Sequence, residues 1–170
     1  IGNQQKMALF DNLLHDFTKD EVETVVGHEL GHYVNKDIIR GLILESILIF
    51  PLLFVVDYSV DISAAMLGVQ GIGDLASLTL IGMIYGTLGF LLMPLTNAHS
   101  RWRESEADKF ALEHVKKPLP QISTEKRLAD MNLAELSHQP LIEFWLFTHP
   151  STVRRIRMAE DWNKKIKKQN

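Results

Sequence analysis

Cysteine is absent from this 170-residue sequence, which excludes disulfides and thiolate metal ligands. Any bound metal ion would therefore take histidine and carboxylate ligands. The charges nearly balance, with a formal net charge of −3, so the composition gives no indication of nucleic-acid binding. The chain begins at Ile1, without an initiator methionine or a signal-peptide pattern. We interpret residues 1–170 as a fragment that forms a single domain.

Charged residues are also absent from Leu75–Leu95, a stretch long enough to cross the hydrocarbon core of a bilayer. Ile38–Val56 is a weaker candidate, because Glu45 is costly in lipid and Pro51 would kink a helix. A buried helix of a soluble domain is the alternative for this segment. We expect a helical membrane hairpin over residues 38–95, with Glu45 facing protein or a water-filled cavity.

The connection between these two stretches contains acidic residues but no lysine or arginine, and the basic residues lie outside the hairpin. The acidic residues are Asp57, Asp61 and Asp74, and the basic ones are Lys36, Arg40, Arg101 and Arg103. Positive residues favour the cytoplasmic side, so both ends of the hairpin should lie there. The segments that flank the hairpin should then meet on that side of the membrane.

The segment before the hairpin, Thr18–Asn35, carries a helix-start signal. Thr18 and Glu21 form a capping box, in which each side chain satisfies a free amide of the first turn. Apolar residues then recur at helical spacing, which predicts one buried side made of Val22, Val25, Val26, Leu30 and Tyr33.

Within this helix, His28 to His32 reads H-E-L-G-H and follows the H-E-x-x-H pattern. Residues four apart lie one turn above each other, so both imidazoles can bind one zinc ion. Glu29 is offset around the axis, where it can take a proton from water at the metal. The pattern indicates a metallopeptidase. The alternative is a helix that simply exposes two surface histidines.

The segment after the hairpin, Ala98–His114, is the natural source of a third ligand. Glu104 and Asp108 are four residues apart and share a helical face. Glu104 can complete a His-His-Glu set, and Asp108 can accept the free N–H of a ligand histidine. His99 is a competing ligand, and a charged helix surface is the alternative for the whole segment. Two histidines and one carboxylate would also suit Fe(II).

Three further segments allow more than one interpretation. Lys6–Leu14 predicts a short edge β-strand beside the metal helix, with a core strand as the alternative. Pro118 and Pro120 are expected to break the chain, with another amphipathic helix over Thr124–Ser137. Leu141–Phe147 is a dense apolar patch that suits either a core position or a membrane-interface anchor.

His149 precedes Pro150 at the start of the last predicted helix. A histidine at such a turn is usually structural. In a zinc peptidase it could instead donate a hydrogen bond to the developing oxyanion, with an arginine in support.

With these residues assembled, the chain resembles the CAAX prenyl protease type I family of integral-membrane zinc metallopeptidases, which includes bacterial heat-shock relatives. The resemblance covers nearly the whole length and depends on the order of four motifs. These are Leu9–Leu14, His28–His32, Ser100–Asp108, and His149-Pro150 with Arg155 downstream.

The resemblance implies a mainly α, multi-helix membrane metallopeptidase with one Zn²⁺ per chain. The residues that it assigns to the site are His28, His32 and Glu104 as ligands, Glu29 as general base, Asp108 behind a ligand, and His149 and Arg155 around the scissile carbonyl. It further implies a peptide or protein substrate, prenylated in one branch of the family and a misfolded membrane protein in another. The membrane would be the bacterial inner membrane or the endoplasmic reticulum.

Two positions depart from the eukaryotic members of this family. Asp37 stands where they carry another histidine, and Ser151 stands where they carry a second proline. We expect neither residue to touch a proposed ligand, although both weaken a requirement for a prenylated substrate. A non-catalytic membrane scaffold with a structural metal site is the rival from another class, but such a site would not need Glu29.

Overall fold

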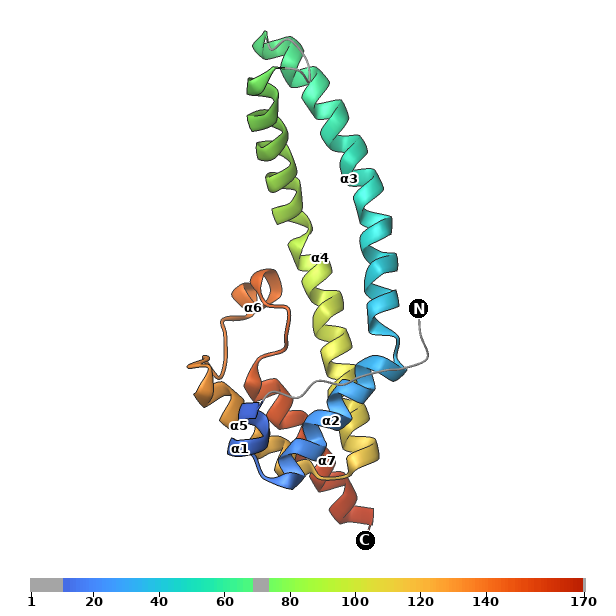
Figure 1. The fold of residues 1–170 in the computed structure, drawn as a ribbon, viewed down its shortest axis with the longest axis vertical. Coiled ribbons are helices and arrows are strands. Elements are labelled where there is room, and N and C mark those ends of the chain that lie inside the picture. The colour runs from blue at the N-terminus through green and yellow to red at the C-terminus, as the bar shows by residue number, and fades with distance from the viewer. Residues whose placement is uncertain (1–10, 69–73, 170) are drawn as a thin grey trace.

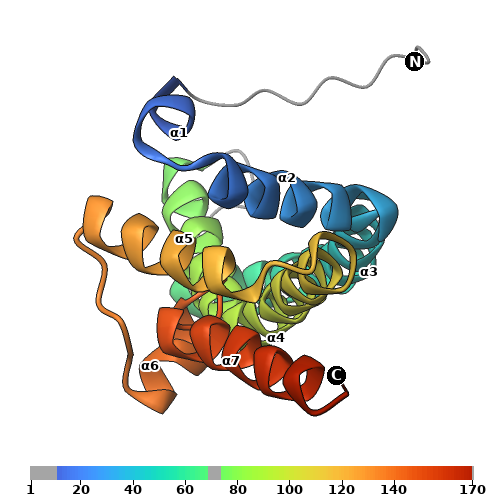
Figure 2. The same ribbon diagram turned by 90° about the horizontal axis from the view of Figure 1, so that it is seen from below.

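The computed structural model describes residues 11–68 and 74–169, and this part of the chain is helical without a β-strand. Its helices are α1 (Asp11–Asp16), α2 (Lys19–Val34), α3 (Asp37–Leu67), α4 (Leu75–Val115), α5 (Pro118–Met131), α6 (Pro140–Leu146) and α7 (Thr152–Gln169). The long arms α3 and α4 form a hairpin that projects from a cluster of the shorter helices α1, α2, α5 and α7 (Figure 1). Viewed along the hairpin, α2 and α7 lie on opposite sides of α4 (Figure 2).

The predicted edge strand is wrong where the structure describes it. Residues 11–14 belong to helix α1, and residues 6–10 lie outside the described residues. Asp11 in the first turn and His15 in the last turn of α1 complement the helix dipole. A strand also needs a neighbouring strand to satisfy its backbone, and the described part of the chain offers none.

The capping box of α2 forms as predicted. Thr18 Oγ1 accepts a hydrogen bond from the Glu21 amide at 3.3 Å, and Glu21 Oε2 accepts one from the Thr18 amide at 2.8 Å. The predicted buried face does not form, because Leu30 and Tyr33 are exposed and the valines are half-buried.

Small residues bring α2 close to α4 instead. The buried side of α2 consists of Glu21, Thr24, Gly27 and Gly31. A Cβ atom at Gly31 would lie 2.9 Å from the Ala107 backbone, so only glycine fits there without moving a helix. This close approach brings the histidines of α2 within reach of α4.

The hairpin presents its apolar residues at the surface. Two stretches are long and apolar enough to cross a membrane, one in α3 and one in α4, and almost none of their length is buried. This exposure argues against a core helix of a soluble domain over Ile38–Val56. Pro51 lies inside α3 without ending it, and Glu45 is exposed, so the described residues do not cover that carboxylate.

The predicted hairpin and the predicted third-ligand segment are joined in one helix. α4 runs for 41 residues, through Pro94, from the apolar stretch to Glu104 and beyond. A single continuous helix therefore connects the candidate membrane span to the site.

The helix predicted over Thr124–Ser137 instead spans Pro118–Met131. α5 begins at Pro118, because a proline is tolerated in the first turn of a helix, where its missing N–H is not needed.

α6 packs on α4, where the Phe90 and Trp145 rings lie 5.1 Å apart and Asn97 donates to the Trp145 carbonyl at 2.6 Å. Its apolar side chains Leu141, Ile142, Phe144 and Leu146 are exposed, which is not the position of core residues.

Candidate metal centre

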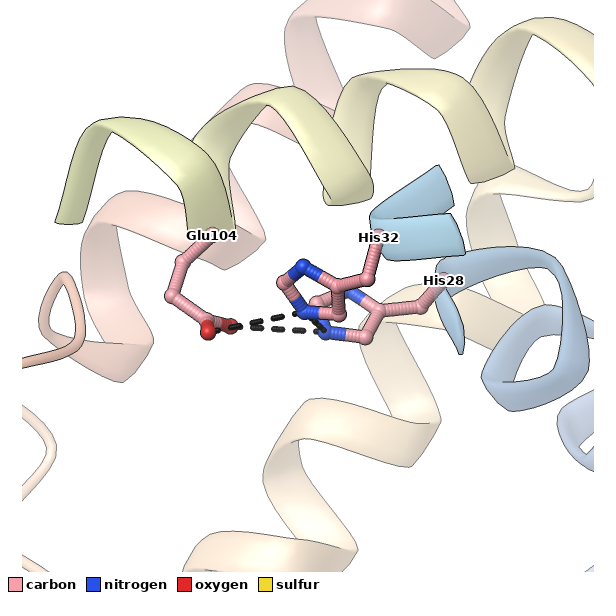
Figure 3. A group of neighbouring side chains, drawn as sticks. All are labelled: His28, His32 and Glu104. Atoms are coloured by element: carbon pink, nitrogen blue, oxygen red, sulfur yellow. Dashed lines mark hydrogen bonds and ion pairs between the residues drawn. The ribbon is translucent and has the colours of Figure 1, made fainter. Parts of the chain in front are cut away.

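His28 and His32 on α2 converge with Glu104 on α4 (Figure 3). The two Nε2 atoms are 3.0 Å apart, His28 Nε2 lies 3.3 Å from Glu104 Oε2, and His32 Nε2 lies 3.5 Å from Glu104 Oε1. In tetrahedral zinc, with bonds near 2.0–2.1 Å, neighbouring ligand atoms lie about 3.3 Å apart. The three side chains therefore already have the spacing of one metal coordination sphere.

The hydrogen bonds behind the histidines fix which nitrogens face the centre. His28 Nδ1 lies 2.8 Å from Asp108 Oδ1, and His32 Nδ1 lies 2.7 Å from Asp37 Oδ2. An ionised carboxylate only accepts, so each Nδ1 carries a hydrogen, and in the neutral imidazole each Nε2 then presents a lone pair. The lone pairs of the two Nε2 atoms and of the Glu104 carboxylate then point at one place, and only a cation can relieve their repulsion. The residues fit a divalent metal ion.

The electrostatics of the site also favour positive charge. Burial lowers the pKa of the His28 imidazole, but hydrogen bonds with Asp108 and Glu104 outweigh burial and raise that pKa to about 9. The pKa of His32 is also raised, mainly by its hydrogen bond with Glu104. A proton can be placed on only one of the atoms His28 Nε2, His32 Nε2 and Glu104 Oε at a time, whereas a metal ion can bind all of them at once.

Asp108 connects the site to α7. It is 1% exposed, and its two oxygens accept from Arg155 Nη2 and Nε, the latter at 2.7 Å. Arg155 Nη1 lies 2.9 Å from Glu125 Oε2 on α5. Arg155 thus contacts Asp108 directly and lines the cavity beside the metal-binding residues, and the structure adds Glu125 to this buried network.

His149 and Glu29 complete the surroundings. His149 Nε2 lies 3.4 Å from Glu104 Oε1, and the His149 side chain is 59% exposed. Glu29 stays outside the metal-binding group but lines the same cavity as His28 and His149. His99, the competing ligand, is not in that group, and its ring lies 5.7 Å from the Trp102 ring.

The expectation that Asp37 touches no ligand is wrong. Lys36, two residues after the end of α2, has a left-handed φ of 56°, and the chain turns there so that α3 starts at Asp37 beside His32. Arg103 Nη1 donates to the Asp37 carbonyl at 3.0 Å and links this turn to α4. Ser151 is buried at the start of α7, where its carbonyl accepts from the Arg154 amide at 2.9 Å.

Replacing Asp37 by asparagine is expected to weaken zinc binding about 10–100-fold, because the carboxylate that orients His32 is lost. Titration of the full-length protein with zinc against a competing chelator measures the Kd. Asp16→Asn, an exposed change on α1, is the matched control. An unchanged Kd in Asp37→Asn would show that this carboxylate does not orient the ligand.

Comparison with known proteins decides the family. Residues 1–163 match the profile of Peptidase family M48. The chain belongs to peptidase family M48. This confirms the resemblance inferred from the motifs, because M48 relatives of this chain include a CAAX prenyl protease 1 homolog and proteases named HtpX.

The relatives carry three different names. The chain is 30% identical over 164 residues to the uncharacterized metalloprotease YhfN of Bacillus subtilis, covering 94% of this chain and 38% of that protein. It is 30% identical to a protease HtpX homolog of Paracidovorax citrulli (79% and 47% covered). It is 27% identical to the CAAX prenyl protease 1 homolog of Dictyostelium discoideum (89% and 36% covered). The chain thus spans less than half the length of these relatives.

The fold is also shared with a solved structure. The crystal structure of S. mikatae Ste24p matches 89% of this chain and 39% of that chain, with a TM-score of 0.74 and 20% identity. Its similarity supports the helical arrangement described above. The metal-binding group itself follows from the side chains of this chain.

Proposed function

We propose that the full-length protein is a membrane zinc endopeptidase with one zinc ion per chain. The observation that carries this proposal is the spacing of His28 Nε2, His32 Nε2 and the Glu104 carboxylate, which matches one tetrahedral metal ion. Zinc, when bound, polarises a carbonyl oxygen and makes water more acidic. Membership of a peptidase family supports hydrolysis of peptide bonds as the reaction.

The residues around the centre have separate roles in this proposal. Glu29 takes the proton from the attacking water, because it lines the cavity without belonging to the ligand group. His149, with Nε2 directed at the Glu104 side of the centre, donates a hydrogen bond to the carbonyl oxygen as negative charge develops. Arg155 holds Asp108, which in turn orients His28.

The site lies at the cytoplasmic end of the hairpin in this proposal. The basic residues Lys36, Arg40, Arg101 and Arg103 occur in the chain at the site end, and Asp57, Asp61 and Asp74 occur towards the turn. The positive-inside rule then places the turn on the opposite side of the membrane. A label accessible only from outside should modify a cysteine introduced at Asp74 and not one introduced at Lys116.

Metal removal tests the proposed function. Protein purified without added metal should contain one zinc per chain, lose cleavage of a peptide library on chelation, and regain it on adding zinc. His32→Ala should lose both zinc and activity, whereas His99→Ala should retain both. Iron in place of zinc would indicate a non-haem iron site. Absence of both metal and cleavage would leave the non-catalytic membrane scaffold as the remaining hypothesis.

Prenylation is a separate question for the substrate. The names of the relatives divide between protease HtpX and CAAX prenyl protease 1, so family membership does not choose between them. Measuring the cleavage rates of a farnesylated peptide and of the same peptide without the farnesyl group distinguishes these two kinds of protease. Equal rates would indicate a protease without prenyl specificity, and a strong preference for the farnesylated peptide would indicate C-terminal processing.

A further inference from the structure

A cavity of about 160 Å³ opens beside the metal-binding residues and extends to a group of residues that the proposed hydrolysis does not use. Besides the site residues already described, Arg155 among them, its lining includes Thr24, Val25, Gln121, Thr124, Glu125 and Leu128. This volume holds several water molecules, and therefore also the end of a substrate side chain. Its position next to Glu29 places such a side chain close to the bond that is cleaved.

Gln121 is one of the lining residues of this cavity, and its side chain carries a buried acceptor without a partner. Its side chain is buried, with 4% exposure, and its Nε2 lies 3.5 Å from the Asp108 carbonyl oxygen. A carbonyl oxygen only accepts, so the amide nitrogen must face it and the amide oxygen must face away. That oxygen, Gln121 Oε1, has no hydrogen-bond partner within residues 11–68 and 74–169. A buried acceptor left unpaired is costly, so the site favours a donor.

Glu125 adds negative charge at the same place. It is 6% exposed and pairs with Arg155, but Arg155 is shared with Asp108, which takes two of its N–H groups. One guanidinium thus serves two buried carboxylates. Burial raises the pKa of Glu125 to about 7, although the positive charge of Arg155 opposes that rise. A second cation beside Glu125 would stabilise its ionised form.

We propose that this cavity binds a basic side chain, preferably lysine, of the substrate residue beside the scissile bond. The proposal rests on the proposed peptidase function and names its substrate class. Val25 and Leu128 would line the aliphatic stem of the lysine. The ammonium group has three donors and no acceptor, which suits the free oxygen of Gln121 and the carboxylate of Glu125.

Paired peptides test this specificity. The full-length, zinc-loaded protein is given peptides that differ only in lysine or norleucine at the positions flanking the cleaved bond. Norleucine keeps the aliphatic stem and lacks the ammonium group. We expect kcat/KM for the lysine peptide to be at least tenfold higher at one of these positions, because the oxygens of Gln121 and Glu125 would stay unpaired with norleucine.

Variants link the preference to the cavity. Glu125→Gln and Gln121→Met each remove an acceptor and should reduce the lysine preference at least threefold. Asp130→Asn makes the same chemical change as Glu125→Gln at an exposed position of α5 and should leave the preference unchanged. Zinc content is measured for every variant. If Glu125→Gln fails to fold and lacks zinc, Gln121→Met decides the outcome.

The outcomes separate this inference from the proposed function. Cleavage of both peptides at equal rates would overturn the lysine preference while the peptidase function stands. A lysine preference that persists in both cavity variants would also overturn it, because the basic side chain would then bind elsewhere. Failure of the zinc-loaded protein to cleave either peptide or the library would overturn the peptidase function, and the inference with it.

Discussion

Replacing Glu29 by glutamine is expected to lower kcat/KM for peptide cleavage by about 10²–10⁴-fold while zinc content stays unchanged. Glutamine has nearly the same shape but cannot take a proton from water. Glu29 lies outside the metal-binding group, so its loss removes no ligand. Cleavage assays and metal analysis of the same full-length preparation measure both quantities.

Glu113→Gln is a suitable control for this substitution. Glu113 is an exposed carboxylate on α4 that pairs with Lys109 at 3.8 Å, far along the helix from the ligand Glu104. This surface pair contributes little, so its loss should leave both zinc content and cleavage unchanged. Cleavage by Glu29→Gln at the normal rate would refute the role of general base. Loss of zinc in Glu29→Gln would show that the carboxylate supports the metal-binding group.

Local sequence patterns predicted much of the metal centre. The capping box located the start of α2, and the spacing of His28 and His32 placed both rings on one face of it. The same reasoning put Glu104 and Asp108 on one face of a later helix. These predictions succeeded because each depends on neighbours within one turn of a helix, where backbone geometry is nearly fixed.

Features that depend on a turn of the chain or on contacts between separate helices were missed. Asp37 reaches His32 only because Lys36 adopts a left-handed conformation, which its residue type does not favour. Gln121 and Glu125 come to the site by packing of α5 against α2 and α7, and no spacing in the sequence relates them to the histidines. Local pattern predicted a helix over Thr124–Ser137, but the proline that starts α5 at Pro118 was interpreted only as a break in the chain.

Apolar periodicity gave the wrong buried face for α2. Its apolar residues are half-buried or exposed, whereas the side that meets α4 carries Gly27 and Gly31. Close contact between two helices requires small residues, and these give no hydrophobic signal. In the hairpin the apolar residues face outward, as in a chain whose surroundings there are lipid. Hydrophobic patterning therefore marks the exposed surface of the two candidate membrane helices better than the core of the described residues.

Replacing Asp108 by asparagine is expected to lower the free energy of unfolding by about 3–5 kcal/mol, because it breaks a buried ion pair and leaves Arg155 with too few acceptors. Zinc affinity should also fall about 10–100-fold, since the Asp108 carboxylate orients His28. Denaturant unfolding and zinc titration of the full-length protein measure the two effects.

Asp161→Asn serves as the control for this buried pair. Asp161 also forms an ion pair, with Lys164 at 3.0 Å, but both side chains are exposed on α7. Exposed pairs contribute about 0–1 kcal/mol because water screens them. If Asp108→Asn destabilised the protein no more than Asp161→Asn, the network from His28 through Asp108 to Arg155 would not hold the centre together. A loss of zinc affinity without a loss of stability would instead limit the role of Asp108 to orienting His28.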